Sequence, residues 1–246
     1  MKNKIIIVCT IVASLVILVQ GCMKEPTETT TKGKVDVYVD ESLYPVMKQE
    51  EEKFESLYTQ ANISLVKTTS REGIVQFLNV ETTQVFVSFR QMNAEEQAVM
   101  KRADMTPQEY RVALDAVVFI VHPTNPVDSL RLTQLDSVFK GITKTWNELG
   151  WKNNSVSIGT CIPGQNSGLY EVVARKILHG EKFAPVSQIL DSSEAMLRYV
   201  EEHQNALGIM SVSTLRGRDD KVKIVALTDP SAPDSLGTKG KYYTPH

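Results

Sequence analysis

The stretch Tyr110-Arg-Val-Ala-Leu-Asp-Ala-Val-Val-Phe-Ile-Val121 decides the expected fold, and it ends at His122-Pro123. Its apolar residues do not alternate with polar ones, as they would in a strand with one face in water. A long apolar run of this kind indicates a strand buried on both faces, which is typical of a sheet covered by helices on both sides. We therefore expect an α/β fold with a strand over residues 110–121.

Strand and helix patterns alternate along the chain on both sides of that run. The other expected strands cover residues 34–40, 62–67, 84–89, 156–162, 207–212 and 222–227. The expected helices cover residues 43–58, 74–80, 93–102, 132–139, 167–178 and 192–203. Such alternation predicts helix-flanked sheets whose strands are mostly parallel.

The composition is that of an ordinary globular protein. The 246 residues are 42% hydrophobic and 23% charged, and this much apolar material excludes a disordered chain. With 27 Lys and Arg against 29 Asp and Glu, the formal net charge is −2. A protein that binds duplexes normally carries a basic surplus, so we expect no nucleic-acid partner.

The first residues predict an export signal. A charged start precedes an apolar run over residues 5–19, which is shorter than the roughly 20 residues of a membrane span. The run ends in Leu18-Val-Gln-Gly-Cys22, which resembles a bacterial lipobox. We expect a signal peptide over residues 1–21, a lipidated tether over residues 22–33 with the lipid on Cys22, and a protein anchored at the cell envelope. An uncleaved N-terminal anchor is the alternative.

The sequence offers no pattern for catalysis or metal binding. The histidines have no zinc-site spacing and are His122, His179, His203 and His246. Ser167 lacks the G-x-S-x-G frame of a nucleophile. Cys161 lies in an apolar strand pattern, as a core residue would. We expect neither an enzyme nor a cofactor nor a metal.

Hydroxyl residues and glycine recur where expected strands meet expected helices. Ser42 and Ser70 follow the first two strands, Ser167-Gly168 precedes a helix, and Arg90 ends the third strand. Helix starts offer free N–H groups, and ligands of open α/β sheets gather at the carboxyl ends of strands. These residues therefore predict an oxyanion site. Helix capping for the serines and a salt bridge for Arg90 are the alternatives.

The order of these pieces resembles the phosphate-binding substrate proteins of bacterial ABC transporters. The most specific match is Leu132-Thr-Gln-Leu-Asp-Ser-Val-Phe-Lys-Gly141 with Thr145-Trp146, which resembles the family's L-x-x-I-F-x-G-x-I-x-x-W segment. The matching loops are Asp40-Glu-Ser-Leu-Tyr-Pro45, Thr69-Ser-Arg-Glu-Gly-Ile74, Phe86-Val-Ser-Phe-Arg90, Gln165-Asn-Ser-Gly168 and Asn205-Ala-Leu-Gly-Ile-Met210.

The resemblance implies the two-lobed type II periplasmic-binding fold. Lobe one would take residues 34–115 plus 210–246 and lobe two residues 116–209, with hinges at 113–117 and 208–210. The family continues beyond the position of His246, so either the protein is short or the chain is truncated, and lobe one is expected to be less complete. The residues implied to bind inorganic phosphate or a similar oxyanion are Ser42, Leu43, Ser70, Arg90, Ser167 and Gly168. The implied protein is a monomer that serves an ABC permease.

Three positions depart from the family. Pro163 stands at a usual Arg, Leu169 at a usual Thr, and Arg90 at the Asp that accepts the proton of hydrogen phosphate. Loss of this acceptor weakens the discrimination between phosphate and sulfate. The acidic residues that could replace it are Asp40, Glu41 and Glu72. A surface lipoprotein with the same fold, used for sensing or adhesion, is therefore the alternative function.

Overall fold

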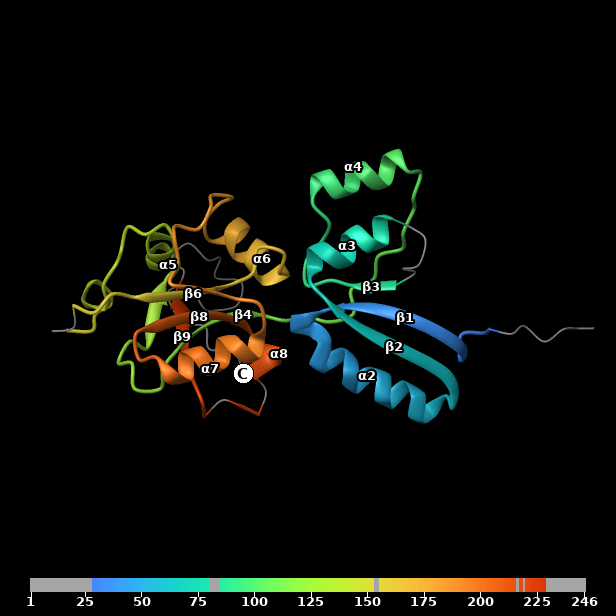
Figure 1. The fold of residues 1–246 in the computed structure, drawn as a ribbon, viewed down its shortest axis with the longest axis horizontal. Coiled ribbons are helices and arrows are strands. Elements are labelled where there is room, and N and C mark those ends of the chain that lie inside the picture. The colour runs from blue at the N-terminus through green and yellow to red at the C-terminus, as the bar shows by residue number, and fades with distance from the viewer. Residues whose placement is uncertain (1–27, 80–84, 153–154, 216, 219, 229–246) are drawn as a thin grey trace, which may run out of the picture.

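The computed structural model describes residues 28–79, 85–152, 155–215, 217–218 and 220–228. These residues form two lobes that lie side by side in Figure 1, each built on its own sheet. The small lobe contains a three-stranded sheet of order β2-β1-β3, and the large lobe a six-stranded sheet of order β5-β9-β4-β8-β6-β7. Among the described strand pairings, all are parallel except those of β4 with β8 and β9. The predicted α/β class with mostly parallel pairing is confirmed.

In the small lobe, the central strand β1 (Lys32–Asp40) pairs with β2 (Gln60–Thr68) and β3 (Val85–Val87). A short 3-10 turn η1 (Glu41–Leu43) follows β1. The helices are α2 (Tyr44–Leu57), α3 (Ser70–Leu78) and α4 (Ala94–Arg102). In Figure 1, α2 lies on one side of the sheet, and α3 and α4 lie on the other. Strand β1 begins inside the stretch that was expected to be tether.

The large lobe carries the remaining elements. Its strands are β4 (Val117–Val121), β5 (Ser129–Arg131), β6 (Gly159–Pro163), β7 (Gln188–Leu190), β8 (Ala206–Ser211) and β9 (Lys223–Thr228). Its helices are α5 (Leu132–Phe139), η2 (Trp146–Leu149), α6 (Gly168–Lys176), α7 (Ser193–Glu202) and α8 (Val212–Leu215). The two helices that matter for the site, α6 and α7, both follow strands of the large sheet.

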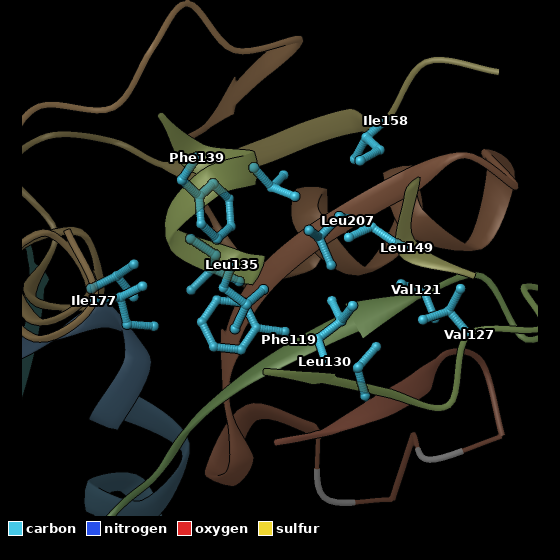
Figure 2. Close-up of a cluster of buried hydrophobic side chains, with 14 of the residues drawn as sticks. Phe119, Val121, Val127, Leu130, Leu135, Phe139, Leu149, Ile158, Ile177 and Leu207 are labelled. Atoms are coloured by element: carbon cyan, nitrogen blue, oxygen red, sulfur yellow. The ribbon is translucent and has the colours of Figure 1, made fainter. Parts of the chain in front are cut away.

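Strand β4 joins the two hydrophobic cores of the large lobe. Phe119 and Val121 belong to one buried cluster, and Val118 and Ile120 to the other. Successive side chains of a strand point to opposite faces, so each face of the sheet has its own core. Figure 2 shows the first cluster, where Phe119 and Phe139 pack with ring centroids 5.9 Å apart. Burial on both faces is therefore confirmed for this strand.

The expected strand over residues 110–121 is wrong in its first half. Strand β4 begins only at Val117, and residues 105–116 form neither helix nor strand. This segment is the green trace between the two lobes in Figure 1. Tyr110 is 73% exposed and Leu114 is 85% exposed. Apolar character alone predicts a strand, but a strand also requires a neighbour with which its backbone can pair.

The chain is divided between the lobes differently from the expectation on its C-terminal side. The expected lobe one included residues 210–246, whereas β9 pairs with β4 and β5 in the large sheet. This pairing covers an edge of β4 that would otherwise expose its backbone groups. Residues 208–210, the expected second hinge, lie inside β8. Residues 113–117 do lie where the chain passes between the lobes.

Other expectations fall on residues outside the described ranges. The signal peptide over residues 1–21, the lipid site Cys22 and the end of the chain from residue 229 belong to this group. Within the ranges that are described, no helix is both long and apolar enough to cross a membrane.

Candidate functional site

A cavity of about 420 Å³ lies between the two lobes. Three helices of the described chain begin at its wall: α3 after Thr69, α6 after Ser167, and α7 after Ser192. Each of these three residues is the N-cap of its helix and accepts a hydrogen bond from a backbone N–H of the first turn. The cavity therefore faces several positive dipole ends, a favourable setting for an anion.

The side chains around the cavity are acidic. The carboxylates among the lining residues are Asp40, Glu41, Glu72 and Asp191. No Lys, Arg or His occurs among the lining residues within the described part of the chain. An anion in this cavity would therefore be held by backbone N–H groups and hydroxyls, and not by cationic side chains.

Ser42 and Ser70 meet at one carboxylate. Asp40 Oδ1 accepts hydrogen bonds from the Ser42 backbone N–H at 3.0 Å and from Ser42 Oγ at 2.5 Å. Ser70 Oγ donates to Asp40 Oδ2 and lies 3.3 Å from Ser88 Oγ. Asp40, Ser42 and Ser70 are all buried. The side-chain cap of α3 comes from Thr69 and that of η1 from Asp40, so capping explains neither Ser70 nor Ser42.

Ser167 and Gly168 bring the large lobe against this group. Ser167 caps α6 by accepting a hydrogen bond from the Leu169 N–H at 3.2 Å. A Cβ on Gly168 would lie 2.5 Å from Ser70 Oγ, closer than real Cβ contacts allow. Nearby, the Arg71 N–H donates to the Asn166 carbonyl at 3.1 Å. Glycine is therefore favoured at position 168 because its backbone lies directly against the side chains of Ser70 and Phe89 from the small lobe.

Arg90 is held by carboxylates and does not line the cavity. Its guanidinium donates two hydrogen bonds of 2.8 Å to Glu96, on α4 of the same lobe. Its Nε forms an ion pair with Glu171, which lies on α6 of the large lobe. The side chain of Arg90 is only 1% exposed. The salt-bridge alternative for Arg90 is what the structure shows, and the pair with Glu171 connects the two lobes.

The two carboxylates around Arg90 differ in their protonation behaviour. Burial by itself raises the pKa of Glu96, but hydrogen bonds from Arg90 and the Asn93 backbone outweigh it, so the pKa is lower than usual. Burial raises the pKa of Glu171 above its usual value, although the Arg90 charge opposes this shift. For Arg90 itself, burial lowers the pKa, but Glu96 and Glu171 outweigh it and raise the pKa.

Of the expected site residues, Ser167 alone borders the cavity among the described lining residues. Ser42, Ser70 and Gly168 surround Asp40 at the edge of the cavity. Leu43 is half-buried and precedes α2 without a capping bond from its side chain. The assignment of these residues to a ligand stays a prediction.

The contact between Glu41 and the start of α7 was not expected. Glu41 Oε1 accepts a hydrogen bond from the Ser193 N–H at 3.1 Å, and Oε2 accepts one from Ser193 Oγ at 3.2 Å. The Ser192-Ser193 pair predicted the start of a helix, which is confirmed. Nothing in the sequence indicated that a residue 152 positions earlier would reach it.

Comparisons with known proteins agree with this architecture. A family model described as a PBP superfamily domain matches residues 24–243. The phosphate-binding protein PstS of Staphylococcus saprophyticus is 25% identical over 231 residues, covering 91% of this chain and 70% of its own. PstS of Staphylococcus haemolyticus is 22% identical over 209 residues, covering 85% of this chain and 65% of its own. The chain thus spans about two thirds of the length of these relatives.

Solved structures show the same fold. A Clostridium perfringens protein described as a phosphate ABC transporter substrate-binding protein, crystallised with bound phosphate, superposes with a TM-score of 0.72. It is 25% identical, and the match covers 85% of this chain and 83% of that one. An ABC-type phosphate transport receptor from Vibrio cholerae matches with a TM-score of 0.61 at 19% identity, covering 85% and 83%. These likenesses confirm the expected two-lobed type II fold.

Proposed function

This chain belongs to the PBP superfamily, and we propose on that premise that it captures inorganic phosphate between its two lobes for an ABC importer. The observation that carries the proposal is the convergence of the starts of α3, α6 and α7 on one cavity between the lobes. The similarity to proteins named for phosphate binding supports the choice of ligand. The protein would act by binding alone, without chemical turnover.

Binding would rely on neutral donors. Thr69 and Ser167 place hydroxyls around the cavity, and the helices that begin beside them, α3 and α6, offer N–H groups. Hydrogen bonds to an ionised acceptor are about twice as strong as neutral ones, and exclusion of water strengthens them further. Closure of the lobes around the anion would provide that exclusion.

We propose that a lipid on Cys22 holds the protein at the membrane surface and that it meets the permease as a monomer. The alternative function is a surface lipoprotein of the same fold that senses or adheres. The acidic cavity lining and the neutralisation of Arg90 by Glu96 and Glu171 favour that alternative.

Calorimetric titration of the purified protein with phosphate and then with sulfate tests the proposal. We expect saturable heat with phosphate, because a cavity lined by helix starts favours an oxyanion. Absence of heat with both anions, in a protein that unfolds cooperatively, would rule out capture of an oxyanion. Equal affinities for phosphate and for sulfate would show that the site does not distinguish the two anions.

A further inference from the structure

The hydroxyl donors expected for an oxyanion are occupied by a carboxylate of the chain itself. Asp40 accepts three hydrogen bonds, from the N–H and Oγ of Ser42 and from Oγ of Ser70. These three residues are at most 2% exposed. The donors therefore have a charged partner inside the protein and are screened from water.

The large lobe closes over the same carboxylate. A Cβ on Gly168 would lie 3.3 Å from Asp40 Oδ2, so the backbone of α6 begins directly beside it. Asp40 also borders the cavity between the lobes. An anion that reached Ser42 and Ser70 would thus meet Asp40 at contact distance. Two negative charges this close repel strongly where water is scarce.

Two further anion-binding groups are occupied in the same way. The N–H and hydroxyl of Ser193 at the start of α7 donate to Glu41. The guanidinium of Arg90 is neutralised by Glu96 and Glu171. Each of these groups is therefore already bound to an acidic side chain of this chain.

We propose that Asp40 is a built-in anion that competes with the external oxyanion for Ser42 and Ser70 and thereby limits its affinity. This inference rests on the proposed function and identifies the residue that sets its strength. Replacement of the carboxylate by an amide of the same shape would remove the repulsion and the acceptor of Ser70, and would leave Ser42 with only a neutral oxygen to compete with the external anion. The gain would apply to phosphate and to sulfate alike, because Asp40 repels both.

The test compares Asp40→Asn with the parent protein by calorimetry with phosphate and with sulfate. Asp36→Asn is the matched control, because Asp36 is an exposed residue on the same strand β1 and loses the same charge. We expect Asp40→Asn to bind both anions at least about tenfold more tightly than the parent, and Asp36→Asn to match the parent. Asp40→Ser is a second variant that removes the same charge, and it is used if the Asp40→Asn protein does not fold. Thermal unfolding checks that each variant is folded.

The outcomes separate this inference from the proposed function. If Asp40→Asn weakens phosphate but not sulfate, Asp40 accepts the proton of hydrogen phosphate, and the inference is overturned while the function stands. Equal affinities of Asp40→Asn and the parent, or an equal gain in Asp36→Asn, also overturn it. Binding by Asp40→Asn but not by the parent supports the inference, and it shows that the native protein does not itself capture the anion. No binding by the parent or by either folded variant at position 40 overturns both.

Discussion

The two lobes are stabilised by different kinds of buried residues. The large lobe has two apolar clusters, one on each face of its sheet. In the described part of the small lobe, the buried apolar residues are Val37, Val39 and Ile74. Its buried polar residues are Asp40, Ser42, Ser70 and Arg90. The small lobe thus buries more polar than apolar side chains, and those polar groups lie toward its partner lobe.

This difference shows where the small lobe finds its stability. A small sheet with little apolar core is marginal by itself. Contacts with the large lobe supply partners for its polar groups, among them the ion pair of Arg90 with Glu171 and the hydrogen bonds of Ser193 with Glu41. Ser213 Oγ also donates to the Ser42 carbonyl at 3.1 Å. We infer that the large lobe folds around its own core, whereas the small lobe depends on the interface.

The largest effect is expected from Trp146→Ala in the large lobe. Trp146 is fully buried, and its Nε1–H donates to the Asn205 carbonyl at 2.9 Å. Loss of a buried aromatic side chain costs about 3–5 kcal/mol of unfolding free energy through lost transfer energy and the cavity left behind. Urea unfolding measures this cost. Trp151→Ala is the control, since Trp151 is only partly buried and should cost clearly less. Equal costs would contradict a core centred on Trp146.

A somewhat smaller effect is expected from Arg90→Met, which tests the dependence of the small lobe on the interface. The substitution leaves Glu96 and Glu171 without their shared cation. Breaking a buried ion pair on one side costs about 3 kcal/mol or more, which should fall mainly on the small lobe. Hydrogen exchange of the β1 amides should then increase more than that of the β4 amides.

The control for Arg90→Met is Lys48→Met, which removes an ion pair on α2 whose lysine is 43% exposed. Such surface pairs contribute about 0–1 kcal/mol, so this variant should change little. If Arg90→Met lowers the free energy of unfolding as little as the control does, or if hydrogen exchange rises equally in both lobes, the small lobe does not depend on the interface more than the large lobe does.

Much of the fold could be predicted from local patterns, because periodicity reports which faces of an element are buried. The strand patterns around Val37 and Phe119 lie within β1 and β4. The pattern over residues 110–116 failed because no single segment shows whether a partner strand lies beside it. The resemblance, and not a local pattern, assigned residues 210–246 to lobe one, whereas β9 pairs with β4 and β5 in the large sheet.

The sequence could predict only those parts of the candidate site whose positions depend on neighbouring residues in the chain. Ser42, Ser70 and Ser167 follow from the order of strand, turn and helix. The contact of Asp40 with Ser42 spans two residues and belongs to the same turn. Arg90 has one partner in its own lobe, Glu96, but its second partner Glu171 and the partner of Ser193, Glu41, come from the opposite lobe, and only the docking of the two lobes brings them together.

The smallest expected effect is the pH dependence of Glu96 and Glu171, the two carboxylates that pair with Arg90. The pKa of Glu171 is raised above its usual value mainly by burial, whereas that of Glu96 is lowered because the hydrogen bonds from Arg90 and Asn93 outweigh burial. On acidification Glu171 should therefore take up its proton first, and the pair between the lobes should weaken while the pair within the small lobe persists. Carboxyl-carbon NMR titration should show the midpoint of Glu171 above that of Glu96.

The consequence for stability follows from the direction of each shift. Glu171 binds its proton more tightly when folded, so its protonation does not itself destabilise the protein. Glu96 binds its proton less tightly when folded, so its contribution is present above its unfolded pKa and is lost as pH falls through its lower folded pKa. Glu171→Gln should remove the upper midpoint without lowering the free energy of unfolding at neutral pH, because the raised pKa means that the folded protein favours a neutral group at this position. A midpoint of Glu96 above that of Glu171 would reverse the assignment, and Glu96, not Glu171, would then be the weaker partner of Arg90.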